Sequence, residues 1–495
     1  MIEAPSRVPE PAPAEALRDR LTDAGYTTER IEETLGGGRI SFWPTDVEVH
    51  ARRLRTDGPF STLARLFLLG MTVSTTEVRA ALAPLDAADL ERSGWLAADG
   101  DGVTAMVKLV PHGDLLIASD RDAGGPTAAD WVAGIHPPSA TLAKLTVRRP
   151  VERAVDVGTG NGIQALLAAR HARTVTATDV NARALEFAAL NAALNGIGNV
   201  QYRQGSYFEP VARERFDLLT CNPPYVISPE SQFAFRDSGL PGDTVSQRVV
   251  EGAPALLQDG GFAHLLVSWA HTPGDSWSAV VDWIDGRGCD AWLLHFGSDD
   301  PVTHAAEWLK QVAREDPDAY RDSLGRWLDY FEDLGIEAIA HGAVILRRRD
   351  GRNWTRRDTV SLDRLEQASE HMLQTFAAQT YLHELADDRE LLDERLALPE
   401  THRLEQTLTC HDGRTEVQST VLGRNDGLAF QVALDAHTAQ LVPLLDGRRA
   451  LREALAQRAT AMALTPDDAQ RFELAALPAV RRLLELGLLV RPGTV

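Results

Sequence analysis

The pattern of apolar and polar positions divides the chain into a helical beginning, an alternating centre and a mixed end. Residues 14–90 repeat apolar positions at helical spacing, and Ser74 with Glu77 forms a capping box at the start of one of these helices. Short strand-like runs follow at residues 105–110 and 114–118. This order predicts a winged-helix-like or small α+β module, which we assign to residues 1–130. Such modules bind nucleic acid or protein, and the absence of a basic recognition helix favours protein.

The centre alternates strand-like and helix-like segments. A helix is predicted at residues 163–172, and apolar runs typical of strands lie at 154–157, 174–178, 216–220, 261–267, 291–296 and 341–346. Residues 301–334 add a helical pair rich in Trp and Tyr. A helical stripe of aromatic residues usually packs in a core, so we interpret this insert as packing first and as a substrate lid second. We assign residues 131–355 to one α/β domain.

The end of the chain mixes both kinds of pattern. Residues 358–398 are acidic and helical, and residues 404–434 alternate as strands with a turn at 425–427. The last run, 480–489, resembles residues 90–96, because each predicts a helix that ends in glycine before a strand, as in a winged helix. We assign residues 356–495 to a second α+β accessory domain.

Composition narrows the class of protein. The chain has 495 residues, 44% of them hydrophobic, and at ~100–200 residues per domain this length fits about three domains. Its three cysteines form no C-x-x-C pair, which argues against a disulfide framework or structural zinc. The sequence begins with no charged-then-apolar leader and has no run near the ~20 apolar residues that span a bilayer. We therefore expect a protein of the reducing cytoplasm that does not enter a membrane.

The charge balance indicates whether the protein is suited to bind nucleic acid. Fifty basic and 71 acidic residues give a net charge of −21, whereas a protein that grips a phosphate backbone normally carries a basic face. The one basic cluster is residues 347–357, in which six arginines accompany Trp354. We interpret it as a solvated hairpin tip that pairs with the acidic stretch 366–394, and an RNA grip is the alternative.

The segment Asn222-Pro223-Pro224-Tyr225 carries the candidate chemistry. It follows the strand-like run 216–220 and joins an amide, a rigid turn and an aromatic ring. A planar nitrogen is a poor nucleophile until acceptors hold its hydrogens. Asn222 and the Pro223 carbonyl can supply two such acceptors, and Tyr225 a face on which a flat group stacks. The segment therefore favours methylation of a planar nitrogen over an ordinary loop.

A glycine loop upstream indicates a nucleotide-like cofactor. Gly158, Gly160 and Gly162 follow the apolar run that contains Asp156, and the next strand ends in Asp179, where an acid can accept both hydroxyls of a ribose. A dinucleotide-binding loop is the alternative. Its glycines would run G-x-G-x-x-G, whereas these run G-x-G-x-G, and hydride chemistry would leave residues 222–225 unexplained.

Together these motifs resemble class I S-adenosylmethionine-dependent methyltransferases, in the small-methyltransferase branch that includes release-factor glutamine and rRNA guanine N-methyltransferases. The resemblance covers about residues 135–350. It implies a Rossmann-like core with a mostly parallel seven-stranded sheet, in which the last two strands form an antiparallel, hairpin-like edge. It also implies S-adenosylmethionine as cofactor, S-adenosylhomocysteine as product and no metal. The loop for the methionine part would include Asp156, Gly158, Gly160 and Gly162, the ribose acid would be Asp179, and the substrate clamp would be Asn222, Pro223, Pro224 and Tyr225.

Three segments depart from or extend this pattern. Ser206 stands where the family has an acid for the adenine amino group, and Tyr207 or Phe208 can flank the adenine ring. The loop with Phe235, Arg236 and Asp237 resembles the substrate-side loop of glutamine methyltransferases, although Arg236 and Asp237 could equally pair with each other. The segment around His136 lacks that family's usual arginine and acid, so we assign His136 no catalytic role.

The sequence therefore predicts an N-methyltransferase that acts on a planar amide or amino nitrogen. We favour a glutamine-like amide of a protein or peptide, because of the acidic balance and the resemblance of residues 233–243. An rRNA or tRNA base and a small molecule are the alternative acceptors. A non-catalytic binding module that kept the cofactor fold is disfavoured, since both Asn222 and Asp179 are present.

Overall fold

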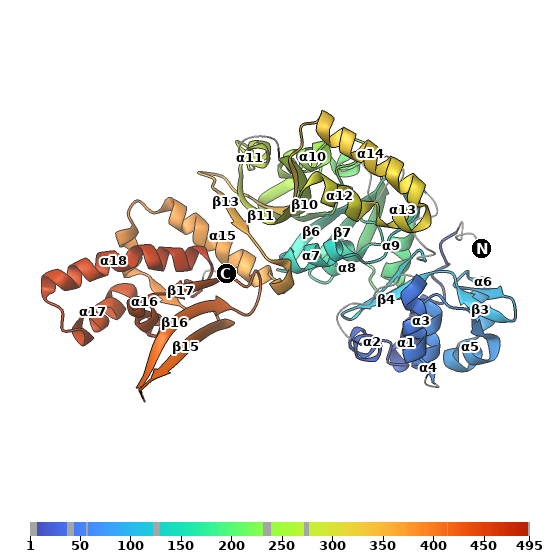
Figure 1. Cartoon of the computed structure of the whole chain (residues 1–495), viewed down its shortest axis with the longest axis horizontal. Coiled ribbons are helices and arrows are strands. Elements are labelled where there is room, and N and C mark those ends of the chain that lie inside the picture. The colour runs from blue at the N-terminus through green and yellow to red at the C-terminus, as the bar shows by residue number, and fades with distance from the viewer. Residues whose placement is uncertain are drawn as a thin grey trace. The chain divides into compact units, whose positions relative to one another are not determined.

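The computed structural model describes residues 7–36, 44–55, 58–121, 129–230, 239–271, 277–412 and 414–493. The chain forms two compact units (Figure 1). Unit 1 comprises Met1–Leu142, Pro150–Arg287 and Gly297–Arg348, and unit 2 comprises Ala143–Arg149, Gly288–Phe296 and Arg349–Val495. Among the described residues, no helix has both the length and the apolar character needed to cross a bilayer.

Unit 1 begins with helices followed by short antiparallel strands, in the predicted order. Ser74 caps helix α5 by accepting a hydrogen bond from the Glu77 backbone N–H, as its capping box predicts. The helices are α1 (Ala14–Asp23), α2 (Thr28–Leu35), α3 (Pro44–Arg53), α4 (Pro59–Leu63), α5 (Thr75–Leu82) and α6 (Ala87–Arg92). The strands are β1 (Val73–Ser74), β2 (Leu96–Asp99) and β3 (Gly102–Ala105) in one sheet, and β4 (Lys108–His112) and β5 (Leu115–Ser119) in a hairpin.

A mostly parallel sheet forms the centre of unit 1. Six of its strands lie in the order β12-β10-β9-β6-β7-β8. Neighbours are parallel except β12, which runs antiparallel to β10. These strands are β6 (Val151–Val157), β7 (Ala172–Asp179), β8 (Val200–Gln204), β9 (Phe216–Cys221), β10 (Leu257–His271) and β12 (Ala338–Arg348). The predicted Rossmann-like α/β class is confirmed, although the sheet has eight strands among the described residues rather than the predicted seven. Strand β12 is the antiparallel partner of β10.

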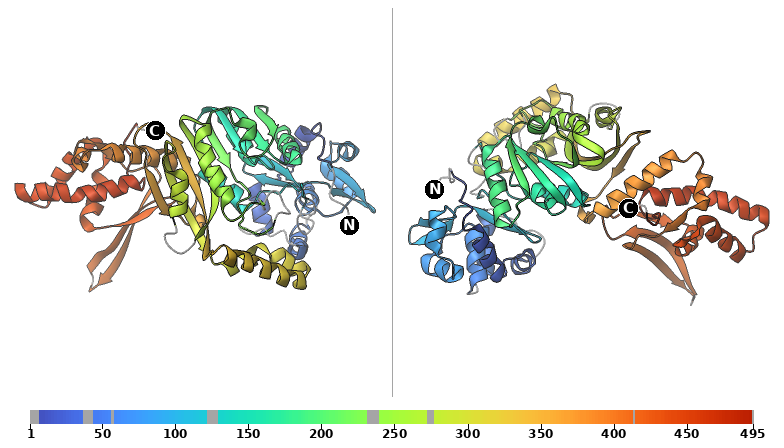
Figure 2. Two further views of the ribbon diagram at one scale, coloured as in Figure 1. Left: turned by 90° about the horizontal axis from the view of Figure 1, so that it is seen from above. Right: turned by 180° about the vertical axis from the view of Figure 1, so that it is seen from behind.

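Helices flank this sheet and connect its parallel strands (Figure 2). They are α8 (Ile163–Ala168), α9 (Ala182–Leu194), α10 (Thr244–Gly252) and α11 (Ser278–Ile284). The first helices and α9 share one hydrophobic core, in which Leu17 and Trp95 pack in the same cluster as Phe187 and Leu194. The N-terminal residues are thus anchored on the helix that follows Asp179.

The insert predicted at residues 301–334 contains three helices, not two. They are α12 (Pro301–Trp308), α13 (Lys310–Glu315) and α14 (Pro317–Asp333). Proline lies at the N-terminal end of α12 and of α14, where its missing N–H costs nothing. Trp327 and Phe331 are buried with Ile227 and Ile339, so the aromatic stripe packs as core, as predicted.

Unit 2 combines strands and helices around its own core. Its strands are β11 (Cys289–Asp299, whose end lies in unit 1), β13 (Thr355–Thr359), β14 (Arg395–Ala397), β15 (His402–His411), β16 (Arg414–Arg424), β17 (Gln431–Leu434) and β18 (Asp446–Ala450). Its helices include α15 (Ser369–Glu384), α16 (Ala436–Leu441), α17 (Leu451–Ala461) and α18 (Pro466–Glu485). Strands β11 and β13 are parallel, and β15, β16 and β17 form an antiparallel sheet.

The interpretation of residues 347–357 as a hairpin tip is wrong. Residues 355–357 belong to β13, which pairs with β11. Arg349 forms an ion pair with the fully buried Asp290 and a second one with Glu384, in the acidic stretch to which the sequence assigned it. Arg349 is therefore held in an internal ion-pair network, although Arg352 and Arg357 of the same cluster are exposed.

Candidate active site

The carboxyl ends of three adjacent strands bring the main predicted residues together. In the parallel register, Val157 of β6 lies beside Thr178 of β7 on one side and Cys221 of β9 on the other. The next residues, Gly158, Asp179 and Asn222, therefore leave the sheet at one edge. In open α/β sheets, ligands bind at this edge.

The glycine loop has a conformation that side chains disfavour. Gly158, Gly160 and Gly162 all have positive φ angles, of 71°, 54° and 89°. A Cβ at Gly162 would lie 2.9 Å from the Cβ of Ala188 in α9, whereas a Cβ at Gly160 would meet no atom within 4 Å. Gly162 thus permits close packing of the loop on α9, and Gly160 keeps open the space in front of the loop.

Asp156 anchors the glycine loop through hydrogen bonds. Its buried carboxylate accepts hydrogen bonds from the hydroxyls of Thr159, at 2.7 Å, and Thr220, at 2.9 Å. Burial raises the pKa of Asp156 from 3.8 to about 6, although both hydroxyls lower it. The loop is therefore tied to β6 and β9 by a carboxylate that is ionised at neutral pH.

Asp179 is half-buried and joins the glycine loop to the end of β7. One carboxylate oxygen accepts the Gly160 N–H at 2.9 Å, and the other accepts the Asn181 N–H at 2.9 Å. Burial raises the pKa of Asp179, and the backbone N–H groups oppose that shift. A carboxylate has about four acceptor positions, so two remain for hydroxyl groups of a ligand.

The clamp residues follow β9. Asn222 is half-buried, and within the described part of the chain its side-chain amide has no hydrogen-bonding partner. The Pro223 carbonyl accepts the Tyr225 N–H at 2.8 Å, which leaves one of its two lone pairs for a substrate. Pro224 is half-buried, as is Tyr225, and burial raises the pKa of the Tyr225 hydroxyl above its usual value.

Ser206 and Tyr207 lie beside Asp179. The N–H of Gly205 donates to the backbone carbonyl of Asp179 at 3.0 Å, which brings the turn after β8 to the end of β7. Tyr207 has a φ of 44°, an uncommon conformation for a residue with a side chain, and is half-buried. The ring of Phe208 lies against Gly252 in α10. Tyr207 is thus the aromatic residue of this turn that remains next to the strand ends.

Phe235, Arg236 and Asp237 lie outside the residues that the structure describes. His136 is exposed just before α7 (Pro137–Leu145), and its carbonyl accepts the Ala140 N–H.

Sequence reasoning missed the polar residues that support the loop. The buried carboxamide of Asn191 donates to the carbonyls of Ala118, at 2.9 Å, and Asn161, at 2.8 Å, and accepts the Ala118 N–H. It therefore ties the glycine loop to β5. Asparagine in an otherwise apolar stretch of α9, repeated four residues later at Asn195, is the signal that would have indicated it.

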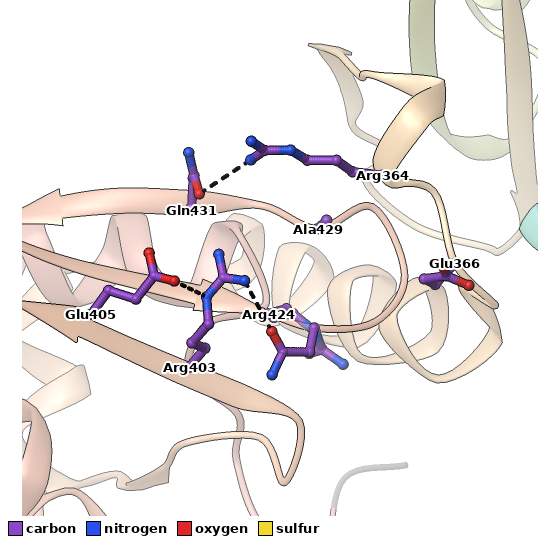
Figure 3. Close-up of a pocket in the computed structure, with 8 residues that line it drawn as sticks. Arg364, Glu366, Arg403, Glu405, Arg424, Ala429 and Gln431 are labelled. Atoms are coloured by element: carbon purple, nitrogen blue, oxygen red, sulfur yellow. Dashed lines mark hydrogen bonds and ion pairs between the residues drawn. The ribbon is translucent and has the colours of Figure 1, made fainter.

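A pocket of about 560 Å³ lies in unit 2 (Figure 3). Arg403 reaches Glu405 at 3.0 Å and Asn425 at 3.3 Å, and Arg364 reaches Gln431 at 3.5 Å. These side chains are paired with one another, and no predicted site residue that the structure describes lines the pocket. The candidate active site is therefore at the strand ends of unit 1.

Comparison with known proteins agrees with this position. Residues 134–276 match the model of the methyltransferase small domain, and residues 23–106 and 373–491 match domains of unknown function DUF7059 and DUF7782. The chain is 30% identical over 243 residues to the release factor glutamine methyltransferase of Xylella fastidiosa strain 9a5c, covering 41% of this chain and 87% of the relative.

Two further relatives match over shorter stretches. The release factor glutamine methyltransferase of X. fastidiosa strain Temecula1 is 37% identical over 129 residues, which cover 24% of this chain and 47% of the relative. The ribosomal protein uL3 glutamine methyltransferase of Bradyrhizobium diazoefficiens is 40% identical over 126 residues, covering 22% and 39%. The chain thus spans less than half the length of these two relatives.

Proposed function

The chain belongs to the S-adenosylmethionine-dependent methyltransferase family that contains the release factor glutamine methyltransferases, and from this premise we propose that it methylates the side-chain amide of a glutamine in a protein. The family resemblance and the methyltransferase class predicted from the sequence are confirmed. The acceptor and the roles of individual residues are proposals, and we expect the reaction to take place in the cytoplasm.

The observation that carries this proposal is the position of Asn222. Its amide lies at the same edge as the glycine loop and Asp179, and has no partner within the described chain. In the proposed complex, Asn222 Oδ1 accepts one N–H of the acceptor amide and the free lone pair of the Pro223 carbonyl accepts the other. Tyr225 supports the flat group by stacking. Two acceptors that point at a nitrogen on which positive charge develops stabilise the transition state.

The residues at the strand ends fit S-adenosylmethionine. The open space in front of Gly160 allows close approach to the loop backbone, and the two remaining acceptor positions of Asp179 suit the two ribose hydroxyls. Ser206 and Tyr207, brought beside Asp179 by Gly205, would lie on the adenine side. When bound, the cofactor supplies an activated methyl group, so the protein's task is to align the acceptor and exclude water.

A protein acceptor is supported by charge and by the relatives. The three relatives are named for methylating release factors or a ribosomal protein. A net charge of −21 disfavours a polyanionic acceptor. We propose that the domains at residues 1–130 and 356–495 help to dock the acceptor on the core at 131–355, and that Phe235, Arg236 and Asp237 contact it.

Transfer of a labelled methyl group tests the proposal. The full chain is incubated with labelled S-adenosylmethionine and host lysate, and the products are digested with protease or with nuclease. We expect label that protease releases, in a protein that mass spectrometry shows to be methylated at glutamine. Asn222→Ala should abolish the label, while the matched control Asn425→Ala, at an exposed residue of unit 2, should not. Label released only by nuclease would refute a protein acceptor.

A further inference from the structure

A cluster of metal-ligating side chains lies where the helical insert meets the sheet of unit 1. Asp299 ends β11, His304 lies in α12 and His341 lies in β12. Each offers one ligand atom, and these atoms all lie within 4.8 Å of one another. The two imidazole rings stack with centroids 5.6 Å apart, and His341 Nε2 lies 3.3 Å from an oxygen of Asp299.

His304 has a ring nitrogen that forms no hydrogen bond with any described residue. The residue is 1% exposed, and its Nε2 lies 3.2 Å from the carbonyl oxygen of Ile227. A carbonyl only accepts, so Nε2 carries the proton and Nδ1 presents a lone pair. This Nδ1 is buried and has no hydrogen-bonding partner among the residues that the structure describes.

The arrangement matches the chemistry of a zinc site. Two imidazoles and one carboxylate are a common ligand set for Zn²⁺, and the fourth position is then open to water. Histidine ligands almost always donate their other N–H to a carbonyl or carboxylate, as His304 does to Ile227. The side chains of His341 and Asp299 are 29% and 41% exposed, so an ion can enter from solvent.

We propose that Asp299, His304 and His341 bind one Zn²⁺ ion, with His304 Nδ1 as the buried ligand. From the sequence we expected no metal, because the family resemblance implies none and the cysteines form no C-x-x-C pair. These three residues are separated along the chain, and only the fold brings them together. The proposal does not depend on the identity of the methyl acceptor.

The ion would fix the position of the helical insert, residues 301–334, next to the substrate clamp at residues 222–225. His304 belongs to α12, which packs in the cluster that also contains Val226 and Ile227, immediately after Tyr225. Its ring also bonds to the Ile227 carbonyl. A metal that fixes His304 to His341 would therefore hold α12 against β12 and limit movement of the chain that follows the clamp. This is a positioning role, and no step of methyl transfer requires the ion.

Zinc titration of the full chain tests the proposal. The protein is freed of metal by dialysis against a chelator and titrated with Zn²⁺ in competition with a chromophoric chelator. We expect one ion per chain and a raised melting temperature. His304→Ala and Asp299→Asn should each weaken binding at least ~10-fold, the loss that removing even an outer-shell partner causes. His437→Ala, at an exposed histidine of unit 2, should bind as the parent does.

Two further measurements separate the site from the alternatives. Replacement of Zn²⁺ by Co²⁺ should give a visible spectrum without the intense sulfur-to-metal bands that binding at Cys221, Cys289 or Cys410 would produce. Circular dichroism shows whether each variant folds, and Asp299→Asn, at a partly exposed side chain, keeps the test independent of the buried His304. Absence of stoichiometric zinc, sulfur bands, or folded variants that bind as tightly as the parent would each overturn the proposal.

Discussion

Substitution of two glycines in the same loop should separate packing from ligand approach. Gly160→Ala and Gly162→Ala place the same methyl group on backbones of similar conformation, with φ angles of 54° and 89°. Their surroundings differ, because the new Cβ would meet no atom within 4 Å at Gly160 but would lie 2.9 Å from the Cβ and 3.0 Å from the Cα of Ala188 at Gly162.

The two environments predict different losses of stability. Left-handed backbone costs an alanine about 1–2 kcal/mol at either position. At Gly162, overpacking against Ala188 adds about 1–3 kcal/mol, because neither a Cα nor a Cβ can rotate away. The free energy of unfolding should therefore fall by about 2–5 kcal/mol in Gly162→Ala and by about 1–2 kcal/mol in Gly160→Ala.

Calorimetry of both variants without and with S-adenosylmethionine provides the assay. Without cofactor, Gly162→Ala should show the larger drop in melting temperature. With cofactor, Gly160→Ala should lose more affinity than its small loss of stability explains, since its methyl group enters the proposed binding space. Equal destabilisation of the two variants, or unchanged cofactor affinity in Gly160→Ala, would refute this account of the loop.

Three further predictions concern the clamp, the acid beneath the loop and the basic cluster. Asn222→Ala should lower kcat about 10²–10³-fold while isothermal titration shows unchanged cofactor affinity, because a preorganised acceptor acts mainly in the transition state. The raised folded pKa of Asp156, about 6 against 3.8, means that its charge costs about 3 kcal/mol at pH 7, and this cost disappears as pH falls from 6 to 4. Urea unfolding across this range should show the parent gaining stability relative to Asp156→Asn as pH falls, and a constant difference would contradict the shift. Arg349→Met should destabilise unit 2 by about 3 kcal/mol in thermal unfolding, because the buried Asp290 then lacks its cation. The control Arg452→Met, at an exposed ion pair, should leave the melting temperature nearly unchanged.

The strand ends could be predicted from the sequence because local signals agree there. The apolar runs before Gly158, Asp179 and Asn222 are strands buried between parallel neighbours. Such strands read as nearly continuous apolar runs, which makes them easy to recognise in the sequence. Parallel strands bring their carboxyl ends to one edge. The three motifs thus meet in space although they are far apart along the chain.

Other features depend on partners that the sequence does not reveal. The sequence does not show whether an arginine such as Arg349 faces water or a buried carboxylate. Its partner Asp290 lies 59 residues away along the chain, so no local pattern indicates the pair. Asn191 in α9 acquires its function only because the glycine loop and β5 pack against the same face. The third helix of the insert was missed because a single short turn near Pro317 separates α13 from α14.

The partners of the arginines in the basic cluster, residues 347–357, bear on the identity of the methyl acceptor. A nucleic-acid base and a glutamine amide can present the same flat nitrogen to Asn222, so the clamp cannot distinguish them, whereas a phosphate backbone requires unpaired cations. Arg349 is bound to Asp290 and Glu384. Arg356 is bound to Asp358, and its guanidinium lies 4.7 Å over the Trp292 ring. These arginines already have partners within unit 2, and recruiting them to phosphate would leave carboxylates such as the buried Asp290 uncompensated. The charge distribution of the chain therefore favours an acceptor that carries its nitrogen on a polypeptide.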